Sequence, residues 1–185
     1  LIKTNGECSE FIARNLTRTD NALNRMTHII QQLTSIAKNE QHERSIQQIE
    51  ALLQSSLERF RGEHPVTPEI PLQTDLPERA TMRANPEIFE SILGKLLENA
   101  WESYREDSSE KERPIQLKAD LIEKRGIPLL RICIIDQGSG LHPSVAENLF
   151  EPFATTKTNA GSGMGLTISR HTLRNLGGDI QLARN

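Results

Sequence analysis

The chain has 185 residues, of which 36% are hydrophobic, enough for one sizeable domain with a smaller appended element. Its 22 basic and 25 acidic residues give a net charge of -3, which excludes the basic footprint of a nucleic-acid-binding protein, so we expect no nucleic-acid partner. The two cysteines, Cys8 and Cys133, lack metal-cluster spacing, and no apolar run reaches membrane-spanning length, so we expect a reduced, cytoplasmic setting.

The first predicted element is a long helix over residues 12–37. Its apolar residues alternate by steps of four and three over nearly four heptads, and they are Ile12, Leu16, Leu23, Met26, Ile30, Leu33 and Ala37. Such a seam is typical of a helix in a coiled coil or bundle, with an ordinary amphipathic surface helix as the alternative. We therefore predict a helical domain at residues 1–40 and a main domain at residues 45–185.

The main domain is predicted to mix helices and strands. Helical spacing of apolar residues predicts a helix from Ile46 to Phe60, and four prolines in residues 62–77 favour an irregular or edge strand. Asn85-Pro86-Glu87 is typical of a helix start, and that helix should extend to about Tyr104. The later expected elements are a hairpin of strands 115–122 and 129–135, helices 144–149 and 166–176, and a last strand 179–183.

The first two motifs of the main domain carry candidate chemistry. Glu98 and Asn99 are neighbours at the C-terminal end of an otherwise apolar helix surface, where the amide oxygen of Asn99 could coordinate Mg²⁺. The alternative is a solvated helix face. Asp136-Gln137-Gly138-Ser139-Gly140 follows a predicted strand, so its carboxylate could accept a hydrogen bond from the exocyclic amine of a base, which Gly140 would let approach closely. The alternative is a plain glycine turn.

Two further motifs follow in the C-terminal part. In Leu149-Phe150-Glu151-Pro152-Phe153 the aromatic residues could anchor one end of a mobile loop, in which Lys157 offers a cation to phosphate. A surface hairpin is the alternative. Gly161-Ser162-Gly163-Met164-Gly165-Leu166 leads directly into a helix, whose N-terminal amides could bind an anion. A flexible linker is the alternative.

Taken together and in this order, the four motifs resemble those of the ATP-binding domain of sensor histidine kinases, part of the ATPase superfamily that includes gyrase. The resemblance covers residues 46–183, and the preceding helix resembles the second helix of the kinase dimerisation hairpin. It implies an α+β fold, a two-layer α/β sandwich of the Bergerat type, in which helices cover one face of a mixed sheet and the nucleotide lies between the helices and a lid.

The resemblance also implies residue roles. Asn99 would bind Mg²⁺, Glu98 would polarise the acceptor histidine, and Asp136 would bind the adenine amine of ATP. The base would be lined by Gly138 and Gly140, and the phosphates would meet Lys157, Gly161, Gly163, Gly165 and Leu166. The implied reaction is phosphoryl transfer to a histidine of a homodimeric helical domain, for relay to a response-regulator receiver domain, with an inner-membrane anchor left open for a longer form.

The chain departs from the family pattern at several points. An asparagine that relatives often carry upstream in the helix motif is Lys95 here, and Trp101-Glu102-Ser103-Tyr104 stands where many relatives have a basic residue. No acceptor-histidine motif is found, and we assign that role to none of the five histidines, His28, His42, His64, His142 and His171. We therefore expect this chain to contain the nucleotide site without its acceptor.

Two other functions compete with the kinase. A nucleotide-binding partner switch or serine kinase of the same superfamily, similar to anti-sigma factors, is the main alternative, and the heptad helix argues against it. A DNA-linked ATPase of the gyrase type is disfavoured by the short lid and the acidic balance.

Overall fold

The computed structural model describes residues 43–65, 70–104, 114–141, 143–146, 148–152 and 163–183, together with six positions between 12 and 26. The chain divides into two compact units, Gln41–Pro143 on one hand and Leu1–Glu40 with Ser144–Asn185 on the other. The six N-terminal positions are helical, and Ile12, Leu16, Leu23 and Met26 among them are 52–61% exposed. The rest of the predicted helix 12–37 lies outside the described residues. Where the structure is described, no helix is both long and apolar enough to cross a bilayer.

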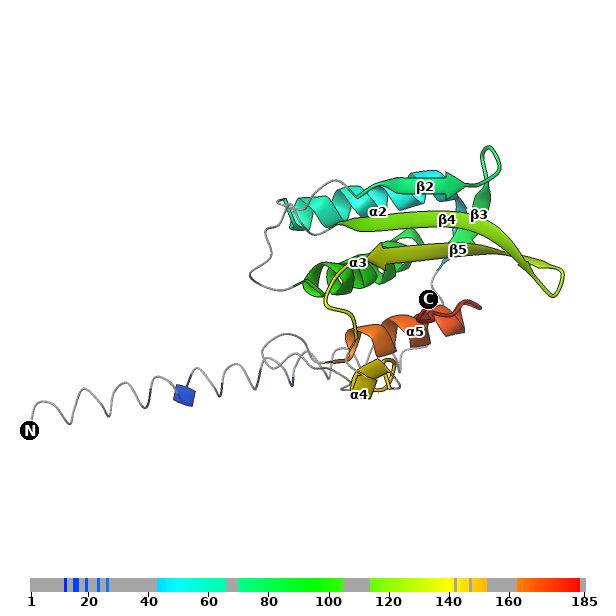
Figure 1. Cartoon of the computed structure of the whole chain (residues 1–185). Coiled ribbons are helices and arrows are strands. Elements are labelled where there is room, and N and C mark those ends of the chain that lie inside the picture. Colours follow the sequence, from blue (N-terminus) through cyan, green and yellow to red (C-terminus); the bar gives the residue numbers. More distant parts are fainter. Residues whose placement is uncertain are drawn as a thin grey trace, which may run out of the picture. The chain divides into compact units, whose positions relative to one another are not determined.

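The unit Gln41–Pro143 is built from a mixed sheet covered by two helices (Figure 1). Strand β4 is the centre of this sheet, pairing in parallel with β2 and antiparallel with β5, and a separate antiparallel pair joins β1 and β3. The elements are β1 (Ser45–Gln48), α2 (Ile49–Glu63), β2 (Leu72–Asp75), β3 (Thr81–Ala84), α3 (Pro86–Glu102), β4 (Ile115–Lys124) and β5 (Ile127–Asp136). The predicted α+β class is confirmed, and β2 is the predicted edge strand within the described part of the sheet.

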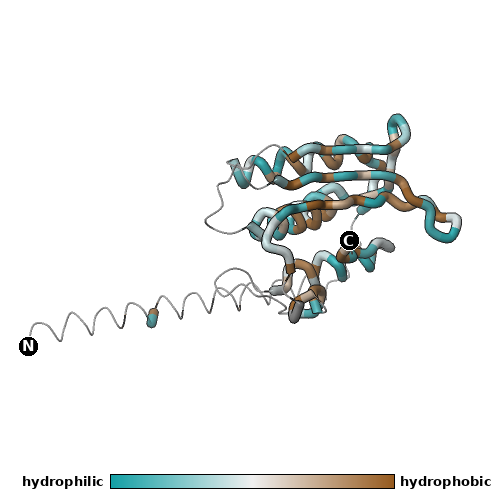
Figure 2. Tube along the Cα trace, in the orientation of Figure 1, coloured by the Kyte–Doolittle hydropathy of each residue, from teal (hydrophilic) through white to brown (hydrophobic). Residues whose placement is uncertain are grey.

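The core of this unit lies between the helices and one face of β4. Ile115, Leu117 and Ala119 alternate along the strand and are each at most 2% exposed, because successive strand residues point to opposite faces. Leu53 of α2 and Leu97 of α3 are fully buried in the same cluster. Hydrophobic residues recur along β4, α2 and α3, whereas the β4–β5 turn is hydrophilic (Figure 2). Burying each such leucine contributes about 1.5–3 kcal/mol to stability.

The β4–β5 hairpin was correctly predicted from sequence. Its loop is Arg125-Gly126, and both residues have positive φ, 57° and 78°. That geometry is the mirror-image type I turn whose twist matches two antiparallel strands, and glycine adopts it without strain. The pairing continues from Lys124↔Ile127 to Ile115↔Asp136, which fixes Asp136 at the end of the strand.

Helix α3 also begins as predicted. The Asn85 side chain accepts a hydrogen bond from the Ile88 amide at 3.0 Å, and Pro86 occupies the first turn, where no amide donor is needed. The helix ends at Glu102, two residues before the predicted end, and carries Asn99 in its last turn. Local sequence therefore determines where this helix starts and where Asn99 lies along it.

The predicted helix start at Ile46 is wrong. Ile46 lies in strand β1 opposite Arg83 and is 72% exposed, and α2 begins only at Ile49, whose amide donates to the Ala80 carbonyl at 3.0 Å. The helical spacing of Ile46 with Ile49 was a coincidence of local pattern. The competing structure is a strand pairing between residues about 35 positions apart, which periodicity does not reveal.

The unit containing the C-terminal residues is centred on α5 (Gly165–Asn175), which confirms the predicted last helix. After Leu176, the Gly177 amide donates to Arg174 O and the Gly178 amide to Leu173 O, and Gly177 has φ 92°. These two bonds form a Schellman C-cap, which explains the glycine pair. The helix α4 (Pro143–Ala146) is shorter than the predicted 144–149, because the Asn148 and Glu151 amides bond three residues back in successive turns before Pro152.

The predicted strand Asp179–Ala183 is wrong, since these residues belong to no strand in the structure. Asp179 instead turns back onto α5, where its Oδ1 accepts hydrogen bonds from Arg170 Nε and Arg174 Nε, both at 2.9 Å. The Arg170 bond, followed by the Arg174 bond, holds the pKa of Asp179 well below its usual range. This link fixes the segment after α5 without any strand partner.

Replacing Asp179 with asparagine should therefore destabilise the protein at neutral pH. The folded-state pKa is depressed, so the stabilisation is complete above the unfolded-state pKa of about 3.9 and is lost as the pH falls towards the folded-state value. Because the carboxylate is partly exposed, we expect a loss of about 1 kcal/mol at pH 7. Thermal unfolding followed at pH 7 and pH 2 should show a difference at pH 7 that shrinks at pH 2. A difference that does not depend on pH would contradict the ion-pair account.

Candidate functional site

Asn99 is half-buried in the last turn of α3, with its side-chain nitrogen already engaged. Nδ2 donates to the Lys95 carbonyl oxygen one turn earlier at 2.9 Å. Because a carbonyl oxygen accepts only from a donor, this bond uses Nδ2 and leaves Oδ1 as the acceptor atom of the amide. Oδ1 is the atom type that a hard divalent ion prefers. The side chain therefore fits the predicted metal role.

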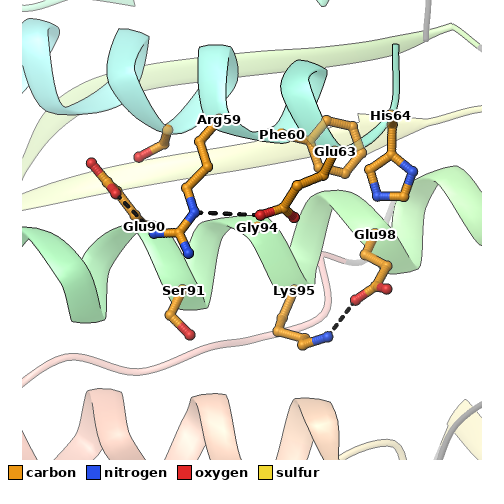
Figure 3. A pocket seen from close by; sticks show the side chains of 10 residues that line it. Arg59, Phe60, Glu63, His64, Glu90, Ser91, Gly94, Lys95 and Glu98 are labelled. Atoms are coloured by element: carbon orange, nitrogen blue, oxygen red, sulfur yellow. Dashed lines mark hydrogen bonds and ion pairs between the residues drawn. The ribbon is translucent and has the colours of Figure 1, made fainter. Parts of the chain in front are cut away.

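Glu98 occupies a different flank of the helix from Asn99, since neighbouring helical residues point about 100° apart. Its Oε2 accepts from Lys95 Nζ at 2.6 Å. Glu98 also borders a pocket of about 170 Å³ between α2 and α3, to which Asn99 does not contribute (Figure 3). The structure thus keeps the two predicted catalytic residues on one helix but does not bring their side chains together.

The α2–α3 pocket is polar and internally paired. Arg59 reaches Glu63 at 3.5 Å and Glu90 at 3.3 Å, and the hydrogen bond to Glu90 is the main cause of its raised pKa (Figure 3). With Lys95 bound to Glu98 as well, both long basic side chains of the pocket are engaged by carboxylates. This pocket is therefore a poor site for nucleotide phosphates.

Asp136 is the last residue of β5, directly before the loop, and its carboxylate is oriented by two donors. Oδ1 accepts from the Ser103 hydroxyl at 2.9 Å and from the Gly138 amide at 3.0 Å. The loop is attached to the end of α3 a second time, because the Ser139 amide and hydroxyl donate to the Ser103 carbonyl at 2.9 and 2.8 Å. Asp136 is exposed to solvent. It is held ready to accept a further hydrogen bond.

The glycines of this loop have different reasons to be glycine. A Cβ at Gly138 would lie 1.8 Å from Ser103 Oγ and 2.8 Å from the Ser103 carbonyl carbon, so no side chain fits there. Gly140 meets no atom within 4 Å, but its φ of 73° lies in the left-handed region that favours glycine. The loop conformation thus accounts for glycine at both positions, and their roles in lining the base stay a prediction.

Two residues at the end of α3 were missed as site residues. Ser103 contacts the loop as described, and the Tyr104 hydroxyl accepts from the Gln137 amide at 2.8 Å while donating to the Pro114 carbonyl. From the sequence alone, both residues were noted only because many relatives have a basic residue in this stretch. Their position in the sequence, just after the Asn99 motif, could have identified them as site residues, because in the fold it puts them beside the end of β5.

The glycine-rich motif before α5 belongs to the other unit and is described by itself. Gly163 has φ 67°, Met164 is 1% exposed, and α5 starts at Gly165 without a side-chain N-cap hydrogen bond. The first amides of a helix, here including that of Leu166, have no acceptor within the helix itself and are the groups that could bind an anion. Lys157 and Gly161, together with the predicted lid 155–162, lie outside the described residues.

Arg170 connects α5 with the aromatic motif of the same unit. Its guanidinium carbon lies 4.2 Å from the Phe150 ring centroid, while its Nε bonds Asp179. A cation over an aromatic ring contributes about 0.5–1 kcal/mol at an exposed site. Phe150 therefore contacts the helix that follows the glycine-rich motif, and the anchoring role of the aromatic motif stays a prediction.

Comparisons with known proteins agree with the motifs. The family model described as "Histidine kinase-, DNA gyrase B-, and HSP90-like ATPase" matches residues 84–185. The chain is 30% identical over 122 residues to the two-component sensor PprA of Pseudomonas aeruginosa, covering 65% of this chain and 13% of PprA. It is 27% identical over 173 residues to the C4-dicarboxylate transport sensor protein DctB of the same species, covering 92% of this chain and 27% of DctB.

A solved structure shares the fold. The histidine kinase ThkA, crystallised in complex with the response regulator protein TrrA, matches with a TM-score of 0.64 and 19% identity over 86% of this chain and 43% of ThkA. The chain spans about a quarter or less of the curated relatives above. Because the family model covers more than half of the chain and contains all the described motif residues, the predicted resemblance is confirmed, and the chain belongs to the histidine kinase-, DNA gyrase B- and HSP90-like ATPase family.

Proposed function

We propose that the chain is the nucleotide-binding part of an ATP-dependent protein-histidine kinase of a two-component system. It would bind Mg-ATP and transfer the γ-phosphoryl group to a histidine of the dimerisation domain, for relay to a response-regulator receiver domain. The observation that carries this proposal is the junction of α3 and β5. There the Ser103–Asp136 bond joins the strand-end carboxylate to the helix that presents the Asn99 amide oxygen.

The residues present fit an adenine nucleotide. Asp136 would accept the adenine amine through Oδ2, because the hydrogen bonds from Ser103 and Gly138 both go to Oδ1. Gly138 and Gly140 would line the base. The phosphates would meet Lys157 and Gly161 together with the amides of Gly163, Gly165 and Leu166, since glycines and a helix start let an anion approach the backbone.

The residues also fit Mg²⁺ bound through Asn99, whose Nδ2 is bonded to the Lys95 carbonyl and whose Oδ1 is the kind of oxygen ligand that Mg²⁺ prefers. When bound, the ion neutralises charge on the phosphates of the nucleotide. Around it, the chain's own residues position the nucleotide. We place Glu98 as the group that polarises the acceptor imidazole, which requires the Glu98–Lys95 ion pair to open or to turn towards the acceptor.

The partners follow from the same proposal. PprA and DctB are named as sensors, and ThkA was crystallised with a response regulator. By analogy, a receiver domain would take the phosphoryl group from the histidine. These relatives favour a kinase over an anti-sigma-like partner switch. We place the chain in the cytoplasm, where ATP is available.

We further propose that the helix of residues 12–37 mediates homodimerisation. Four described seam residues of this helix, Ile12, Leu16, Leu23 and Met26, are exposed in the single chain, and helical seams of this kind pair in coiled coils and bundles. Sedimentation over a range of concentrations should show self-association. A strict monomer at high concentration would contradict this arrangement.

The proposed kinase activity is tested with a longer form of the protein that includes an acceptor histidine. Label from γ-labelled ATP should be acid-labile, as phosphohistidine is, and this chain alone should acquire none. Glu98→Gln should keep nucleotide affinity within about twofold and slow transfer by about 100-fold, because general-base assistance contributes roughly 10²–10⁴-fold. Acid-stable label on serine would contradict the histidine-kinase proposal and favour the serine-kinase alternative.

A further inference from the structure

The C-terminal end of α3 carries a serine whose contacts reach beyond its own helix. Ser103 Oγ lies 2.9 Å from Asp136 Oδ1 and 2.7 Å from the Ala100 carbonyl oxygen. A hydroxyl has one proton to donate, and an ionised carboxylate is the stronger acceptor of the two. The side chain is half-buried, so water competes less for this proton than at a fully exposed position.

The two donors restrict the carboxylate of Asp136. Ser103 Oγ and the Gly138 amide both bind Oδ1, one from α3 and the other from the loop itself. With Oδ1 held from two directions, rotation of the carboxylate about its Cβ–Cγ bond would break both bonds. Oδ2 is then the oxygen presented to a ligand, and its direction is set by α3 rather than by Asp136 alone.

The close packing of the loop on Ser103 makes this direction fixed. The Gly138 backbone lies so near to Ser103 that no Cβ fits between them, and the Ser103 carbonyl binds the Ser139 amide at 2.9 Å. These contacts place the Ser103 hydroxyl and the Gly138 amide on the same carboxylate oxygen. The serine is therefore part of the geometry of the ligand-facing oxygen.

We propose that Ser103 is a positioning residue that makes the site select purines with an exocyclic 6-amine. It does so by holding the Asp136 carboxylate so that Oδ2 is the oxygen that accepts a hydrogen bond from the ligand. This inference rests on the proposed function, in which Asp136 binds the adenine amine. An acceptor held in one direction gains a hydrogen bond from a 6-amine and none from a purine that lacks it. A carboxylate free to rotate loses part of that distinction, because it must be ordered when the ligand binds.

The test compares two nucleotides in each variant by calorimetry, ATP and purine riboside triphosphate, which differs from ATP only by the missing amine. The readout is the ratio of their dissociation constants, in which any general loss of folding or phosphate binding cancels. The unaltered chain should prefer ATP by about tenfold or more, as expected for a hydrogen bond to a charged acceptor. Ser103→Ala should reduce the preference to about two- or threefold, and Ser103→Thr, which keeps the hydroxyl, should retain it.

Ser55→Ala is the matched control. Ser55 Oγ also lies near the carbonyl three residues earlier, Leu52 O at 3.1 Å, and near a carboxylate, Glu90 Oε1 at 3.0 Å, but on α2. This variant should keep the full preference for ATP. An unchanged ratio in Ser103→Ala, beside a ratio near one in Asp136→Asn, would overturn the role of Ser103 and leave the adenine assignment standing. An unchanged ratio in Asp136→Asn would overturn both.

Discussion

Asn99→Ala is expected to lower phosphoryl transfer, in a form of the protein that carries an acceptor histidine, by at least about 100-fold. The expected loss is large because the change removes the amide oxygen proposed to bind Mg²⁺, and charge stabilisation of this kind typically contributes about 10²–10³-fold. The Asn99 amide is already oriented by its bond to the Lys95 carbonyl, so alanine removes an ordered ligand rather than a mobile one. The measurement is the initial rate of label transfer from ATP at saturating Mg²⁺.

Two comparisons separate the metal role from a structural one. Asn99→Asp keeps an oxygen ligand for Mg²⁺ and should retain much more activity than the alanine variant. In a chelator, where no Mg²⁺ is bound, Asn99→Ala and the unaltered chain should bind ATP equally. A loss of ATP affinity in the chelator as large as that in Mg²⁺ would contradict the metal assignment.

Leu97→Ala is expected to destabilise the unit Gln41–Pro143 by about 3 kcal/mol. Leu97 is fully buried among α2, α3 and β4, and truncating a buried leucine costs about 2–5 kcal/mol through lost burial and the remaining cavity. The residue also precedes Asn99 by two positions, so loosening this turn should disturb the proposed metal ligand. Urea unfolding at pH 7 measures the change in the free energy of unfolding.

Leu121→Ala is the matched control for this prediction. Leu121 is the same residue type in the same unit, but it lies in β4 and is 40% exposed. Its truncation should cost less than about 1 kcal/mol, because much of its surface already faces water. Equal losses in the two variants would show that the core does not lie between the helices and the sheet.

Much of the fold was predictable because its signals are local. The start of α3 is encoded by Asn85 and Pro86, the hairpin turn by a glycine at position 126, and the end of α5 by Gly177. Each of these residues acts within a few positions of itself. Ile46 shows the limit, since its strand depends on a partner at Arg83 that no local pattern identifies.

In the candidate site, too, some features could be predicted from the sequence and others could not. Asp136, Gly138 and Asn99 could be identified by residue type and motif order, because each motif is a short stretch with its own chemistry. The contacts that orient them could not, since Ser103 meets Asp136 only when the end of α3 packs beside the end of β5. Glu98 and Asn99 show the converse, because adjacency in sequence placed their side chains on different flanks of one helix.

Calorimetric titration of Mg-ATP shows whether this chain binds ATP with Asp136 on the base. We expect saturable binding to the unaltered chain and an affinity at least about tenfold lower in Asp136→Asn, since a hydrogen bond to a charged group contributes about 1.5–3 kcal/mol. The asparagine is nearly isosteric, so the loop held by Ser103 and Gly138 should survive the change. Absence of ATP binding in the unaltered chain, or equal affinity in the two proteins, would contradict the assignment of Asp136 to the base.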